Sequence, residues 1–159
     1  MKKIVKLILI LAVVVNVAYG AKEENVLFSK VIPEKYDEKV YRKVTVLFTE
    51  ARLKLQKRYR KYLTFIYDEN KKLKNKKEIK KELKKHKARY YVTLEIKEKD
   101  KNCVKTECEV KYIIKVYDGK KNKSQKFKLK GIVKNNEYVD IPSGLIRSNT
   151  SKLVKFLKK

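Results

Sequence analysis

The chain has 159 residues, of which 44 are lysine or arginine and 18 are aspartate or glutamate, so its formal net charge is +26 at pH 7. This length suits one domain with a single hydrophobic core. No stretch after Gly20 is apolar for long enough to span a membrane,.

Residues 1–20 have the pattern of a secretory signal peptide. A charged start precedes an apolar run of about 14 residues, Ile4 to Val17, and Ala18-Tyr19-Gly20 places small residues where a signal peptidase cleaves. The alternative is an uncleaved anchor, but the run falls short of the ~20 residues of a spanning helix, and Lys6 interrupts its start. We expect cleavage after Gly20, and no nearby cysteine could carry a lipid. The predicted location is periplasmic or secreted, and not that of a lipoprotein.

The first half of the remaining domain, residues 21–159, alternates strand and helix patterns. Asn25 to Ile32 predicts a strand,. From Asp37 to about Tyr59, apolar residues recur every three or four positions, which marks one face of a helix. Tyr62 to Tyr67 predicts a second strand. The segment from Asn75 to Lys87 begins like a capping box and predicts a thin surface helix,.

The second half predicts three consecutive antiparallel strands and a final helix. The strands are Tyr90 to Lys97, Cys108 to Tyr117 and Gln125 to Val133, and the helix opens near Pro142,. The element order is therefore β-α-β-α-β-β-β-α. We predict an α+β fold, a two-layer sandwich with a mixed, mostly antiparallel sheet and the helices on one face.

Two cysteines, Cys103 and Cys108, flank the tip of the hairpin formed by the first two of these three strands. In an oxidising compartment such a pair indicates a disulfide. The C-x4-C spacing, without further cysteine or histidine, is a poor zinc site and is not a thiol oxidoreductase motif. A disulfide that closes so small a loop should stabilise the fold by roughly 2 kcal/mol.

The outward face of the three-strand meander is the candidate binding site. If the helices cover the other face, this one exposes lysines with two interleaved tyrosines: Lys97, Lys111, Lys115, Lys126, Lys128, Lys130, Tyr91 and Tyr117. Lysine ammonium groups suit phosphate or sulfate, and tyrosine rings can stack on sugars or bases. The alternative is a plain solvated face, which an antiparallel sheet should also make polar.

Catalytic signals are scarce. The chain lacks the G-x-S-x-G and H-E-x-x-H motifs and any glycine loop that could cradle a phosphate,. The only histidine, His86, lies at the lysine-rich end of the thin helix and is interpreted as a surface residue. We therefore predict no enzyme activity, no cofactor and no metal.

The order of elements resembles a family of envelope domains. The resemblance is carried by LFTEARLKLQKRYRKYLTFI, by a lysine-rich helix, by ARYYVTLEIKE and VKYIIKVYDGKKNK, and by a terminal SKLVKFLKK. The family comprises the periplasmic domains of the curli-secretion and penicillin-binding-protein-activator lipoproteins and the amino-terminal domain of the Tol-Pal β-propeller protein. It implies an assembly or regulatory module that binds protein or wall components.

The predicted function is that of an exported, non-enzymatic binding or assembly module. Loss of Lys2, Lys3 and Lys6 with the leader takes the formal charge from +26 to +23. Either this charge reflects a lysine-biased composition, or it serves to bind polyanions. The expected partners are lipopolysaccharide, teichoic acid, a glycosaminoglycan or an acidic protein, and not intracellular nucleic acid. The alternative function is a small secreted hydrolase or a cationic toxin.

Overall fold

The computed structural model describes residues 22–29, 37–67, 75–98, 108–134, 138–140 and 143–159. Within these ranges, nine elements follow one another: β1 Lys22–Phe28, α2 Asp37–Tyr59, β2 Lys61–Tyr67, α3 Lys76–Lys85, β3 Ala88–Glu98, β4 Cys108–Asp118, β5 Lys123–Lys134, β6 Tyr138–Asp140 and α4 Ser143–Leu157. The predicted order is confirmed, with one addition. The short strand β6 lies between β5 and α4, and its three residues are too few to give a periodic pattern.

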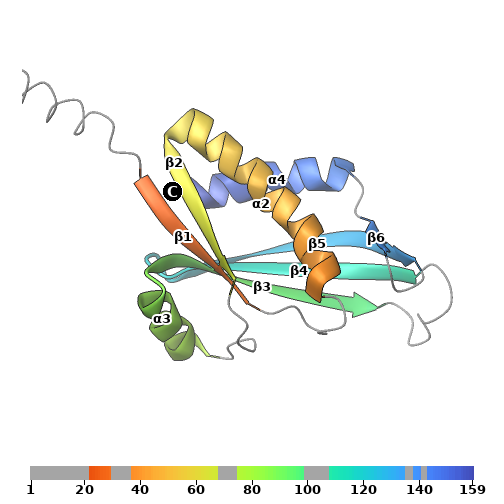
Figure 1. The fold of residues 1–159 in the computed structure, drawn as a ribbon, viewed down its shortest axis with the longest axis horizontal. Helices are drawn as coiled ribbons and strands as arrows, with labels where there is room; N and C mark the ends of the chain where they lie inside the picture. Colours follow the sequence, from red (N-terminus) through yellow and green to blue (C-terminus); the bar gives the residue numbers. More distant parts are fainter. Residues whose placement is uncertain (1–21, 30–36, 68–74, 99–107, 135–137, 141–142) are drawn as a thin grey trace, which may run out of the picture.

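The sheet is mixed, as predicted, and its strands run in the order β2-β1-β3-β4-β5-β6 (Figure 1). β1 lies parallel to both β2 and β3, whereas β3, β4, β5 and β6 pair antiparallel in sequence. Parallel strands need a crossover connection, and α2 supplies it between β1 and β2. β1, the first described strand, is therefore flanked by a neighbour on both sides.

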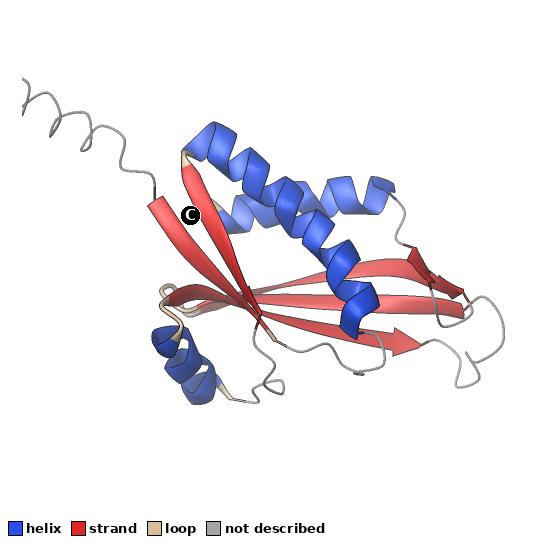
Figure 2. Cartoon of the chain, in the orientation of Figure 1, coloured by secondary structure: helices blue, strands red, loops and turns tan. Residues whose placement is uncertain are grey.

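The main core lies between the sheet and the helices α2 and α4, which cross the same face (Figure 2). The predicted helical period of α2 explains this packing, because its apolar positions are buried there: Val44, Leu47, Phe48, Ala51 and Leu55,. Phe48 meets Phe28 of β1 edge to face, with ring centroids 4.9 Å apart. From α4, Leu153 and Leu157 complete this layer.

Helix α3 packs on the opposite face of the sheet and is the exception to the predicted arrangement of helices on one face (Figure 1). Asn75 caps it as predicted, since its Oδ1 accepts a hydrogen bond from the backbone N–H of Glu78 at 2.9 Å. Leu83 forms a small second core with Leu27, Tyr91 and Tyr117. Alternation along the strands turns these three side chains away from the main core, so they need a separate cover.

The predicted signal peptide lies outside the described residues, and so does Cys103. The cleavage site and the disulfide with Cys108 therefore stay predictions. Within the described ranges, no helix combines the length and the apolar character that a membrane span needs.

Candidate functional site

The six predicted lysines lie on one face of β3, β4 and β5, and we call them the lysine face. In the sheet register Lys97 is opposite Lys111, which is opposite Lys130. Four residues further along β4, Lys115 is opposite Lys126, and Lys128 lies opposite Ile113 between these two rows. All six side chains are exposed. The structure thus brings together the basic residues that alternation alone had placed on this face.

The two tyrosines of the predicted site are not available to a ligand. Tyr91 is 2% exposed and Tyr117 is 3% exposed, because α3 covers this end of the face. The Tyr117 hydroxyl donates a hydrogen bond to Oδ1 of Asn122 at 2.8 Å, and burial raises the pKa of this hydroxyl. The prediction that these rings stack on a ligand is wrong. The face of the sheet on which the two tyrosines lie was predicted correctly. The packing of α3 over them was not predicted, because α3 offers only two apolar residues, Ile79 and Leu83, as a sign of a buried side.

A shallow hollow of about 280 Å³ lies at one edge of the lysine face, where β3 ends and β4 starts. Lys97, Lys111 and Lys130 line it together with Glu98 and Glu109. Nearby, Glu95 Oε1 lies 3.6 Å from Lys97 Nζ. Carboxylates therefore offset part of the charge at this end, whereas the rows around Lys115 and Lys128 are more strongly basic.

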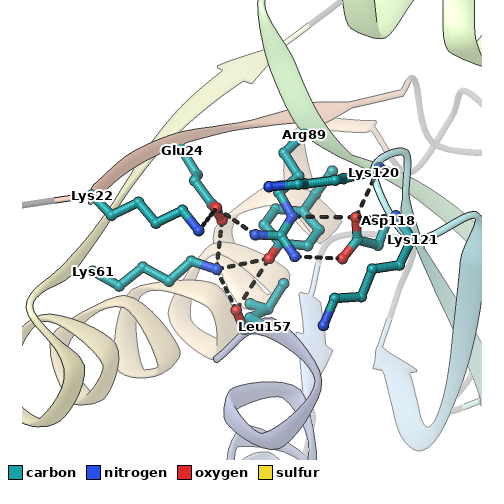
Figure 3. Close-up of polar contacts among 9 residues, drawn as sticks. Lys22, Glu24, Lys61, Arg89, Asp118, Lys120, Lys121 and Leu157 are labelled. Carbon is teal, nitrogen blue, oxygen red and sulfur yellow. Dashed lines mark hydrogen bonds and ion pairs between the residues drawn. The ribbon is translucent and has the colours of Figure 1, made fainter. Parts of the chain in front are cut away.

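A buried ion network, which the sequence did not reveal, joins four strands and the end of α4 (Figure 3). Lys61 Nζ of β2 lies 2.5 Å from Glu24 Oε2 of β1. Arg89 at the start of β3 bonds to Glu24 and also holds Asp118, through Nη2–Oδ2 at 2.8 Å and Nε–Oδ1 at 3.2 Å. Lys61 Nζ also donates to the backbone carbonyl of Leu157, and the Tyr90 hydroxyl donates to the same oxygen at 3.1 Å.

The protonation states of this network follow from its contacts. Burial alone raises the pKa of Glu24, but hydrogen bonds from Lys61 and Arg89 outweigh it and leave that pKa below its usual value,. The pKa of Asp118 is lowered for the same reason, with Arg89 and the backbone N–H groups of Lys121 and Lys120 as donors. Both carboxylates are therefore ionised and paired. A catalytic acid or base needs a pKa close to the working pH, so this pair does not fit that role.

His86 ends α3 as its C-cap and is half-buried, with Nε2 3.5 Å from Glu82 Oε2, so it is less exposed than the sequence suggested. Among the residues that the structure describes, no group of three or more His, Cys, Asp or Glu side chains is close enough to hold a metal ion.

No protein family matches the sequence, and a comparison with curated proteins also finds no match. Among solved structures, the chain is similar to a PelC dodecamer from Paraburkholderia phytofirmans, with 11% identity over 84% of this chain and 88% of that chain and a TM-score of 0.38. It is also similar to lipoprotein GNA1162 from Neisseria meningitidis, with 10% identity over 84% and 97% and a TM-score of 0.41. A hypothetical protein from Chlamydia trachomatis gives 10% identity over 86% and 96% and a TM-score of 0.36. At these scores the likenesses carry no argument about what this chain does.

Proposed function

We propose that this chain is an exported, non-enzymatic binding module whose lysine face holds an anionic envelope polymer. The polymer class is a phosphate- or sulfate-bearing polysaccharide, such as lipopolysaccharide, teichoic acid or a glycosaminoglycan. The signal-peptide pattern supports the export, and the exposed lysines support the anionic partner.

The observation that carries this proposal is the pairing of like charges across the strands. Lys97, Lys111 and Lys130 are direct cross-strand partners, and so are Lys115 and Lys126. Like charges directly opposite one another destabilise a sheet. Glu95 offsets part of the charge of Lys97, so Lys115 and Lys126 are the clearer case of opposed like charges. Anions that bridge the lysines relieve this repulsion.

The geometry of the face suits a chain of anions rather than one compact anion. Neighbouring strands are about 4.8 Å apart, and residues two positions apart on one strand are about 6.6 Å apart. The ammonium groups thus form a grid on an open surface. Lysine imposes little geometry on a phosphate or sulfate, so successive groups of a polymer can each find a cation.

The test compares retention on heparin and on immobilised lipopolysaccharide. Removing three face charges in K111Q/K126Q/K128Q should lower the salt concentration needed for elution and flatten its log–log salt dependence, since fewer counterions are exchanged. The matched control K57Q/K152Q/K155Q loses the same charge from exposed positions on α2 and α4. It should elute close to wild type.

Two results would contradict the proposal. One is retention that does not change between ~50 and ~500 mM salt. The other is an equal loss of retention in both triple variants, which would assign binding to the overall charge instead of to the lysine face.

A further inference from the structure

A second basic site lies between α3, the start of β1 and the β4–β5 turn. It is an open pocket of about 580 Å³, and its lining includes five lysines and one arginine against two glutamates. The five lysines are Lys22, Lys80, Lys84, Lys87 and Lys120. None of them belongs to the lysine face. We propose that this pocket binds the phosphate monoester group of a small organic molecule, such as a sugar phosphate.

Hydrogen bonds hold the two turns that carry pocket lysines. Asn25 Nδ2 of β1 donates to the carbonyl oxygens of His86 at 3.4 Å and Lys87 at 3.3 Å, which ties the α3–β3 turn to the sheet. In the β4–β5 turn, Oδ1 of Asp118 accepts from the backbone N–H of Lys120 at 3.0 Å. A backbone that is already fixed reduces the entropy lost when a ligand binds.

The wall of the pocket does not repel an anion. Glu24 and Arg89 both line it, but Arg89 pairs with Glu24 and Asp118 and Lys61 also pairs with Glu24, so two cations face two carboxylates and these charges largely cancel (Figure 3). Lys22 Nζ lies 3.3 Å from Glu24 Oε1. The four other lysines of the lining outnumber the one other carboxylate, that of Glu23, and leave an excess of positive charge. A phosphate monoester carries about two negative charges, which this excess of positive charge can neutralise.

The size and lining favour an organic phosphate over the free ion. Pockets for small molecules commonly span about 300–1,000 Å³, and this volume leaves room beside a phosphate group. Leu83 and Ala88 contribute apolar surface to the lining. The methylene stems of the lysines add to it, because such side chains cover apolar groups while their ammonium heads reach the anion. The body of a sugar would lie against this surface.

The experiment is isothermal titration of the purified protein with glucose 6-phosphate and with inorganic phosphate, at one pH and one ionic strength. Wild type should bind the sugar phosphate at least tenfold more tightly than inorganic phosphate. K84Q/K120Q removes two exposed pocket lysines and should weaken sugar phosphate binding about tenfold. The control K111Q/K128Q removes the same charge from the lysine face and should stay within about twofold of wild type. Equal urea midpoints establish that both variants fold.

Three outcomes overturn the pocket proposal: no binding of glucose 6-phosphate, equal affinity for the two probes, or equal weakening in the two double variants. None of them affects the polymer proposal, which is measured by heparin retention of the lysine-face variants. Conversely, sugar phosphate binding that survives in K111Q/K128Q supports the pocket whatever the heparin result.

Discussion

At the scale of single residues, Lys61 is a buried cation at the centre of the ion network. It is 3% exposed, and its ammonium group contacts Glu24, Tyr90 and the carbonyl of Leu157. Burial lowers its pKa, and the hydrogen bond from Lys61 to Glu24 acts in the opposite direction. Nothing local in the sequence marks this lysine among its many neighbours. Its partner Glu24 is 37 positions away, and charged residues are normally exposed.

Replacing this ammonium group tests the energy of the network. Lys61→Met keeps the length of the side chain but leaves the Glu24 carboxylate partly unpaired in a buried site. Breaking a buried ion pair from one side costs about 3 kcal/mol or more. We expect the free energy of unfolding in urea to fall by about that amount. The double variant E24Q/K61M should recover part of the loss, because no buried charge is left without its partner. A loss below about 1 kcal/mol in K61M would contradict this assignment.

At the scale of elements, the predictions from the sequence were best where a periodic pattern of apolar residues continued over many positions. The alternation in Tyr90 to Lys97 and in Cys108 to Tyr117 predicted the strands β3 and β4, and it also predicted the face of the sheet on which each of their lysines lies. The three-and-four period gave α2 and its buried face. The ion network was beyond sequence reasoning, because it depends on which strands become neighbours, and β1 pairs with a strand more than 60 positions away. The face on which α3 packs was not predicted, because it too depends on which strands become neighbours: Leu83 packs on residues of β1, β3 and β4.

The contact between α3 and the β4–β5 turn can be tested at one glycine. A Cβ atom at Gly119 would lie 2.6 Å from Leu83 Cδ1 and 3.2 Å from the Arg89 carbonyl oxygen. Leu83 must then move, and overpacking of this kind costs about 1–3 kcal/mol. We expect Gly119→Ala to lower the urea midpoint. Gly144→Ala is the control: nothing lies within 4 Å of its new Cβ, so lower entropy in the unfolded chain should leave stability equal or slightly higher,. Equal effects of the two changes would contradict the close packing of α3.

At the scale of the whole molecule, the net charge of +26 opposes folding through self-repulsion,. Screening by salt weakens repulsion between exposed charges, and the Debye length falls from about 30 Å at 0.01 M to about 8 Å at 0.15 M. We expect the melting temperature, measured by circular dichroism, to rise by several degrees between ~10 and ~150 mM sodium chloride. Heparin at micromolar concentration should raise it further, because a ligand of the folded state stabilises that state. A melting temperature that falls with added salt would contradict this account.

The place of β1 between β2 and β3 has a consequence for how the chain acquires its structure. The two ladders that hold β1 join it to residues 61–67 and 88–92. Closing such long loops is slow, because chain entropy must be lost before the pairing compensates for it. During the proposed export, β1 crosses the membrane early but finds its second partner only after residue 92 has followed. The six-stranded sheet therefore cannot be completed before its last strand, residues 138–140, is available for pairing.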